Sequence, residues 1–318
     1  MSHNVETMMY AGREPWHGLG TKVDDQISIE DAIVAAGLDW RVISRQLYWL
    51  DELDHPYEAG NQVAQMRSSD QAILGYSTAR YVPLQNREAF NFFQPFLDNG
   101  DAHLHTAGSL NGGKTVWVLA KINNADATIG EEDRVDAFVL LSNSHDGTTK
   151  VRVGFTPIAV VCNNTLTLAH SKQSGSKLIS LKHSANMHKN LEMLRESMDV
   201  ARQEFRATAD LYVQLAESDC STEDVRKMVQ IVFDISDEQV EKGNSTVSQI
   251  ITNFHTGRGS GMVSRDGTWW GGYNAVTEYI SHHYGNDANS RLNANWFGAN
   301  RGKNQGSLDY AVAQVIGG

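Results

Sequence analysis

Four strand-like runs follow one another between residues 102 and 161, and they constrain the fold more than any other feature of the chain. The runs are AHLHTAGSL, KTVWVLAKI, DAFVLLSN and KVRVGFTPIAVV, in which β-branched and aromatic residues are frequent. Asn-Gly-Gly at 111–113 and Asp-Gly at 146–147 are typical turn sequences between strands. Because strands joined by short turns pair antiparallel, we expect an antiparallel sheet.

One of these turns overlaps a nucleotide-binding pattern. The stretch GSLNGGKT, residues 108–115, matches G-x-x-x-x-G-K-T, the phosphate-binding loop of nucleotide hydrolases. Such a loop works between a strand and a helix, because the helix N-terminus faces the phosphates. Here Lys114 is followed by Thr-Val-Trp-Val-Leu-Ala-Lys-Ile, which alternates as a strand. We therefore interpret the stretch as a hairpin turn and expect no ATP hydrolysis and no cofactor.

Helical sequence flanks the strands on both sides. SIEDAIVAAGLDW predicts a helix capped by Ser28, and NREAFNFFQPFLDNG predicts one with Asn86 as its N-cap that ends at Gly100. From Met187 to Leu215 an apolar 4-3-4-3 spacing predicts a long amphipathic helix, which packs within the chain or on a second copy. We expect an α+β core over residues 1–190 and a mainly helical C-terminal region over 191–318.

Charge is distributed unevenly along the chain. Its net charge of −11 argues, taken whole, against a nucleic-acid-binding protein. Residues 147–190 differ, because they hold no acid and six basic residues: Lys150, Arg152, Lys172, Lys177, Lys182 and Lys189. Alternation places Lys150 and Arg152 on one strand face, and a mobile Gly-rich loop at 254–267 could bring Arg258 and Arg265 over the same groove. We expect all eight side chains to contact phosphates, mainly along the backbone, because Phe155 is the one aromatic residue in this basic window.

Catalytic and metal sites have little support in the sequence. His103 and His105 fall on one strand face, but no third ligand stands at a suitable spacing, so we expect no metal. Cys162 and His170 would lie about 12 Å apart on a helix, too far for a thiol nucleophile and its base. No apolar run could span a membrane, and two cysteines without a C-x-x-C motif fit a reducing compartment. We expect a cytoplasmic, non-catalytic protein.

Several stretches together carry a family resemblance. In chain order they are GREPWHGLGT, AAGLDWRV, RYVPLQNREAFNFF, TAGSLNGGKTVWVLAKI, LLSNSHDGTTKVRVGFTPIAVVCNNTLTLA and WGGYNAVTEYISHH. They resemble the phage/plasmid-like protein family that bears domain of unknown function 932, over about residues 10–300. VVCNNTL and SHDG are the most specific pieces, and the family brings no catalytic residues. The order of helix, antiparallel strands and helix also resembles the β-β-β-α core of the Rad52-like single-strand annealing proteins.

These features lead to two functional hypotheses. The first is single-stranded DNA binding and ATP-independent annealing in phage or plasmid recombination, by a homo-oligomeric ring or filament in the bacterial host cytoplasm. Such a protein would hold the phosphates and leave the base edges free to pair. The second is a phage or plasmid interaction protein that counters or regulates a host system through its acidic surfaces.

Overall fold

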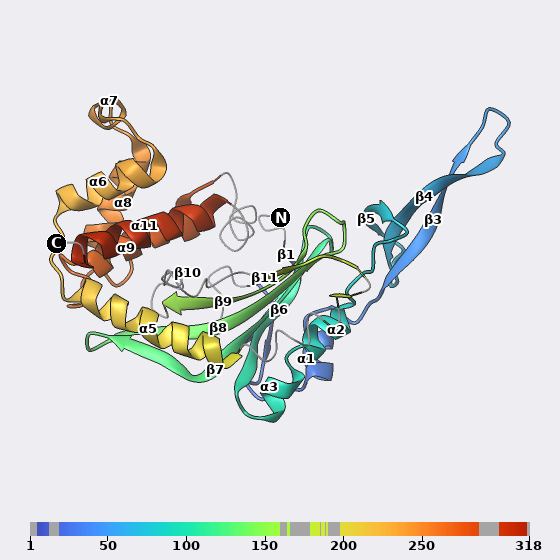
Figure 1. The fold of residues 1–318 in the computed structure, drawn as a ribbon, viewed down its shortest axis with the longest axis horizontal. Helices are drawn as coiled ribbons and strands as arrows, with labels where there is room; N and C mark the ends of the chain where they lie inside the picture. The colour runs from blue at the N-terminus through green and yellow to red at the C-terminus, as the bar shows by residue number, and fades with distance from the viewer. Residues whose placement is uncertain are drawn as a thin grey trace.

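A computed structural model gives the architecture of the chain (Figure 1). The residues that it describes are 5–12, 19–159, 164–165, 179–184, 186–187, 189, 198–285 and 299–316. They form an α+β fold in which helices cover a large sheet and a second, smaller sheet extends away from it. Among the helices described, none is both long and apolar enough to cross a lipid bilayer.

The large sheet forms the centre of the molecule. Within the described residues it has eight strands in the order β10-β9-β8-β7-β6-β1-β2, with β11 beside β9. All neighbours pair antiparallel except β1 and β2, which are parallel. The strands are β1 (Val5–Ala11), β2 (Thr21–Val23), β6 (Ala102–Leu110), β7 (Thr115–Ile129), β8 (Asp133–Ser144), β9 (Val151–Ala159), β10 (Asn164–Thr165) and β11 (Ile179–Leu181). The four predicted runs are thus confirmed as the consecutive strands β6 to β9.

The GSLNGGKT stretch forms the hairpin turn between β6 and β7. Leu110 pairs with Thr115 across the turn. Asn111, Gly112 and Gly113 all have positive φ angles, 55°, 67° and 82°, which Asn and Gly tolerate best. A strand follows Lys114 where a phosphate-binding loop needs a helix, so the predicted hairpin is confirmed.

Alternation along the strands gives the large sheet two apolar faces. Val116, Val118 and Ala120 of β7 belong to the main core, which also contains side chains from the helices. Trp117 and Leu119 point to the opposite face and join a smaller buried cluster with Phe138 and Leu140 of β8. The sequences of these strands are therefore almost continuously apolar, because both faces of the large sheet are buried.

Three short helices cover the main-core face next to β1, β6 and β7: α1 (Ile29–Ala35), α2 (Asn86–Asn91) and α3 (Gln94–Asp98). Ser28 accepts a hydrogen bond from the Asp31 backbone N–H, so the predicted cap of α1 is confirmed. The single helix predicted from Asn86 to Gly100 is instead two helices, because the chain turns at Phe92 and Phe93 and Pro95 opens α3.

The predicted cap of α2 is wrong by one residue. The N-cap is Gln85, whose backbone N–H donates to the Glu88 carboxylate in a capping box. Asn86 is buried instead, and its Nδ2 donates to the carbonyl oxygens of Leu38 and Trp40 at 3.1 and 3.3 Å. Its side chain therefore joins α2 to the segment after α1.

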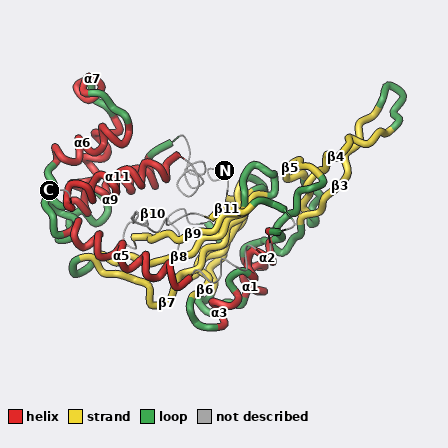
Figure 2. Tube along the Cα trace, viewed as in Figure 1, coloured by secondary structure: helices red, strands yellow, loops and turns green. Residues whose placement is uncertain are grey.

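The C-terminal region is helical, as predicted, and covers the end of the large sheet farthest from the small sheet (Figure 2). Its α5 packs against β7 and α9. Phe205, Thr208, Tyr212 and Leu215 of the predicted seam are buried there, so packing within the chain is confirmed for these positions. Leu191 and Leu194 lie outside the described residues. The elements are α5 (Met198–Ala216), α6 (Thr222–Phe233), α7 (Asp237–Glu241), α8 (Ser245–Thr256), α9 (Trp269–Glu278), the π-helix η1 (Tyr279–His283) and α11 (Ala299–Ile316).

The small sheet has the order β3-β4-β5, with all strands antiparallel: β3 (Val42–Leu50), β4 (Pro56–Arg67) and β5 (Ile73–Thr78). Figure 1 shows the β3–β4 hairpin, residues 42–67, projecting from the body; we call this hairpin the arm. Its base is fixed by Arg67, whose guanidinium pairs with Glu6 at 2.7 Å and Asp70 at 2.6 Å and lies over the Trp40 ring. The sequence analysis did not predict the arm.

Candidate nucleic-acid interface

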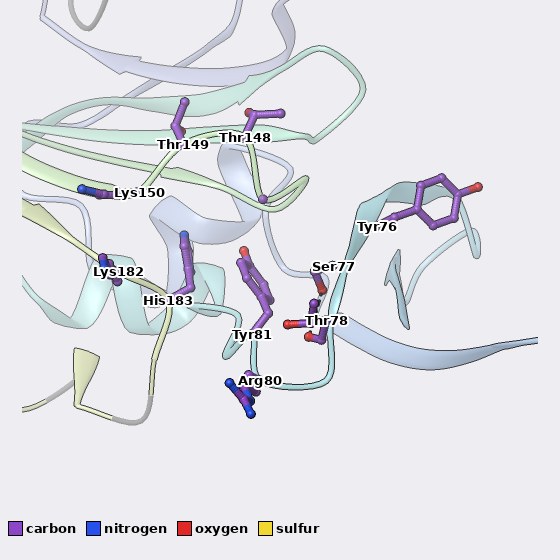
Figure 3. A pocket seen from close by; sticks show the side chains of 11 residues that line it. Tyr76, Ser77, Thr78, Arg80, Tyr81, Thr148, Thr149, Lys150, Lys182 and His183 are labelled. Carbon is purple, nitrogen blue, oxygen red and sulfur yellow. Dashed lines mark hydrogen bonds between the residues drawn. The ribbon is translucent and has the colours of Figure 1, made fainter. Parts of the chain in front are cut away.

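A pocket of about 450 Å³ lies where the small sheet meets the end of the large one (Figure 3). Three separate segments form it: the end of β5 with the turn that follows, the turn between β8 and β9, and the residues after β11. We call it the basic pocket. Its lining residues are Tyr76, Ser77, Thr78, Arg80, Tyr81, Gly147, Thr148, Thr149, Lys150, Lys182 and His183.

Two of the predicted phosphate-contacting residues, Lys150 and Lys182, meet at this pocket, and both are exposed. Arg80 adds a third cation, which the sequence analysis missed because Arg80 lies far outside the basic window. Four serine and threonine side chains accompany the cations, and no carboxylate stands among the lining residues. Cations and hydroxyl donors without a competing acid are what a phosphate group requires.

The acid closest in sequence, Asp146, is turned toward its own loop. Its Oδ1 accepts hydrogen bonds from the Thr148 backbone N–H at 2.9 Å, the Thr148 hydroxyl at 2.6 Å and the Ser144 hydroxyl. Gly147 completes the turn with a φ angle of 75°. The Asp-Gly pair therefore fixes the turn that presents Thr148, Thr149 and Lys150 to the pocket.

Gly75 lets β5 approach this turn closely. A Cβ atom at Gly75 would overlap the Cα of Asp146, so only glycine fits between the two segments. The contact joins the small sheet to the large one beside the basic pocket.

Tyr81 and His183 form the centre of the pocket, where Figure 3 shows them side by side. Their rings stack with centroids 4.5 Å apart. The Tyr81 hydroxyl donates to the Ser144 carbonyl oxygen at 2.8 Å, and burial raises the pKa of this phenol. His183 Nδ1 donates to the Val82 carbonyl oxygen at 3.2 Å, and burial lowers the pKa of the imidazole. Both rings therefore stay neutral at pH 7.

A buried polar network lies behind the turn. His145 Nε2 donates to Asn86 Oδ1 at 3.0 Å, and Asn143 Nδ2 donates to His145 Nδ1 at 3.3 Å and to the Leu84 carbonyl oxygen at 3.0 Å. Burial lowers the pKa of His145 to about 3, so the ring is neutral at pH 7. The network fixes the SHDG turn to α2 and to the segment before it.

The other predicted residues do not line this pocket. Arg152 is half-buried on β9, and burial lowers its pKa. Arg301 of α11 lies close enough for the Arg152 charge to lower its pKa, although burial lowers it more. Lys150 precedes β9 instead of sharing a strand face with Arg152. Lys189 and Arg258 are exposed, whereas Lys172 and Lys177 lie outside the described residues.

The prediction for Arg265 is wrong. Its side chain is buried, and its guanidinium pairs with the buried Asp133 carboxylate at the start of β8. Its Nη1 donates to the Arg258 carbonyl oxygen at 3.0 Å. A guanidinium that is buried in an ion pair cannot contact a phosphate at the protein surface. The segment around it is fixed by this ion pair, so it is not the mobile loop that its glycines suggested.

The two histidines considered as metal ligands have different hydrogen-bond and ring partners. His103 Nδ1 lies 2.7 Å from Asn123 Oδ1, while His105 is edge-on to Phe138. In the described part of the chain, no three His, Cys, Asp or Glu side chains gather as metal ligands would. Burial raises the pKa of the Cys220 thiol to about 12, which makes it unreactive. Cys162 and His170 lie outside the described residues.

A family model described as Domain of unknown function (DUF932) matches residues 73–300 of the chain. The chain belongs to this family. The DUF932 match includes every residue that lines the basic pocket, from Tyr76 to His183. It begins after β4, so the arm precedes it. No curated protein and no solved structure matches the chain. Membership of DUF932 assigns no activity or ligand, so the geometry of the basic pocket is the basis for a functional proposal.

Proposed function

We propose that this protein binds single-stranded nucleic acid by its phosphates at the basic pocket. The supporting observation is that Arg80, Lys150 and Lys182 come from three separate segments and line one pocket without a carboxylate, in a chain of net charge −11. In an acidic protein, a pocket lined by cations is the part of the surface that attracts anions. Phosphate contacts from Lys and Arg supply most of the affinity for nucleic acid.

Tyr76 favours an unpaired strand over a duplex. It is an exposed residue of β5 that lines the pocket, and Figure 3 shows its ring pointing away from Tyr81. An exposed tyrosine ring can stack on an unpaired base, while the cations hold the neighbouring phosphates. In a duplex the base faces are already stacked on one another.

ATP-independent annealing follows from the same arrangement. A protein that holds the phosphates leaves the base edges free to find their complement. The order of strands and helices that resembles the Rad52-like annealing proteins supports this proposal by analogy. The resemblance to phage/plasmid-like proteins makes DNA recombination in a phage or plasmid the proposed setting, with several copies aligned along one strand.

A titration of labelled single-stranded DNA tests the proposal. At about 50 mM salt we expect saturable binding that weakens steeply toward about 200 mM, because bound cations are released from the DNA. A duplex of the same length should bind more weakly, and complementary strands should anneal faster with the protein and without ATP. Absence of single-strand binding at the lower salt concentration contradicts the proposal.

A second function, contact with another protein, is favoured by the arm. Its outer end is apolar and acidic, which does not suit a nucleic acid.

A further inference from the structure

The outer end of the arm, residues 48–58, exposes an unusual number of large apolar side chains. Trp49 and Tyr57 pair across the two strands, and their rings stack with centroids 4.7 Å apart. Exposed aromatic clusters of this kind serve as anchors in protein interfaces. The exposed side chains are Tyr48 (55%), Trp49 (54%), Leu50 (59%), Leu53 (75%) and Tyr57 (46%).

The same end of the arm is acidic. It carries Asp51, Glu52, Asp54 and Glu58, and no Lys or Arg stands between residues 46 and 66. Asp51 belongs to the turn itself, because its Oδ1 accepts the backbone N–H groups of Leu53 at 2.8 Å and His55 at 2.9 Å. The other three acids are exposed. This surface repels phosphates and anionic lipids, and it complements a surface that is basic and partly aromatic.

We propose that the arm end of one copy docks on the basic pocket of a second copy. The arm end carries three exposed acids, and the pocket presents three cations, Arg80, Lys150 and Lys182, beside the exposed Tyr76. Figure 1 shows the arm extending away from its own base, so the two surfaces of one chain lie apart. The apolar side chains supply affinity, and the charges select the partner surface.

A contact between two different surfaces is heterologous. Repeated from copy to copy, it produces a ring if the rotation closes and a filament if it does not. The association itself requires no nucleic acid, so it stands or fails separately from the proposed function. If the basic pocket binds both nucleic acid and the arm end of a second copy, the two compete for the same cations. Binding of a nucleic-acid strand then releases the arm end from the pocket.

Charge reversal in the two surfaces provides the test. The arm variant carries Glu52→Lys and Glu58→Lys, and the pocket variant carries Lys150→Glu and Lys182→Glu. A control variant, Glu238→Lys with Glu241→Lys, changes the same charge on exposed positions of α7, away from both surfaces. Association is measured by sedimentation velocity at low and high salt, and circular dichroism verifies that each variant is folded.

We expect the wild-type protein and the control to self-associate, more weakly at high salt than at low salt because salt screens the charges. Each of the other two variants should be monomeric alone, and their equimolar mixture should associate again, because the reversed arm meets the reversed pocket and the unchanged arm meets the unchanged pocket. A second arm variant, Trp49→Ser with Leu53→Ser, should lose association without any change of charge.

Three results would overturn the inference. They are a wild-type protein that is monomeric at every concentration, association that neither charge variant weakens, and a mixture of the two variants that stays monomeric. The arm variant also separates this inference from the proposed function, because it leaves the pocket intact. Its single-strand binding should equal that of the wild type or exceed it, whatever its state of association.

Discussion

The guanidinium of Arg265 and the carboxylate of Asp133 form an ion pair in which both side chains are almost completely buried, 2% and 0% exposed. Arg265 Nη2 donates to Asp133 Oδ1 at 2.7 Å, and Trp270 Nε1 donates to Asp133 Oδ2 at 2.7 Å. The pair joins the segment before α9 to the start of β8. It is the charged contact between the C-terminal region and the large sheet that we expect to contribute most to stability.

Replacing one partner of this pair should destabilise the protein strongly. Arg265→Ala leaves the Asp133 carboxylate charged and buried, so the free energy of unfolding should fall by about 3–5 kcal/mol. Urea denaturation measures the loss. The double variant Arg265→Met with Asp133→Asn should lose less than the sum of the two single changes, because the members of a pair are coupled. A fall below about 0.5 kcal/mol for Arg265→Ala would show that the segment before α9 is not anchored by this contact.

Two helical glycines should respond in opposite directions to alanine. A Cβ atom on Gly271 of α9 would overlap the Arg265 carbonyl oxygen, whereas a Cβ on Gly302 of α11 has no neighbour within 4 Å. Gly271→Ala should lower the free energy of unfolding by about 1–3 kcal/mol through this overlap. Gly302→Ala should raise it by about 0.5–1 kcal/mol, because alanine favours the helix. Thermal denaturation of both variants measures the difference, and equal shifts would refute the close approach.

The neutral, buried His145 gives stability a pH dependence. Its folded-state pKa of about 3 lies below the ordinary value of 6.5, so the unfolded chain binds the proton between these values and the folded chain does not. Stability from this group is therefore complete above about pH 6.5 and falls by about 1.4 kcal/mol for each pH unit below it. His145→Gln should show a shallower loss of stability between about pH 6 and about pH 4.5 than the wild type.

The exposed His255 supplies the control for this measurement, through the variant His255→Gln. This change removes an exposed histidine and leaves the buried network around His145 intact. If His145→Gln and the wild type lose stability in parallel below pH 6.5, the imidazole is protonated in the folded protein and the buried network is not as described.

Local sequence signals predicted the strands β6 to β9 and the cap at Ser28 well. Alternation and turn residues act over a few neighbours, and a side chain such as Ser28 caps a helix through a backbone N–H three residues away. The hairpin at Asn111 was predictable for the same reason, since the strand after Lys114 excluded a helix.

The arm and most of the pocket could not be predicted in this way. The outer arm is exposed on both faces, so it lacks the alternation that marks a half-buried strand. Arg80 joins Lys150 because the small sheet packs against the turn after β8, a tertiary contact that no spacing shows. Arg265 was misassigned because a charge count cannot distinguish a solvated arginine from one paired with a carboxylate 132 residues away.

The most direct test of phosphate binding at the basic pocket is the salt dependence of single-stranded DNA affinity in the variant Lys150→Ala with Lys182→Ala. Each lost phosphate contact should reduce the slope of log K against log salt by about 0.7, so we expect a reduction of about 1.4 that is similar for all DNA sequences. The control variant, Lys22→Ala with Lys227→Ala, removes the same charge from exposed positions outside the pocket and should keep the wild-type slope. A pocket variant with the wild-type slope and affinity would contradict the account.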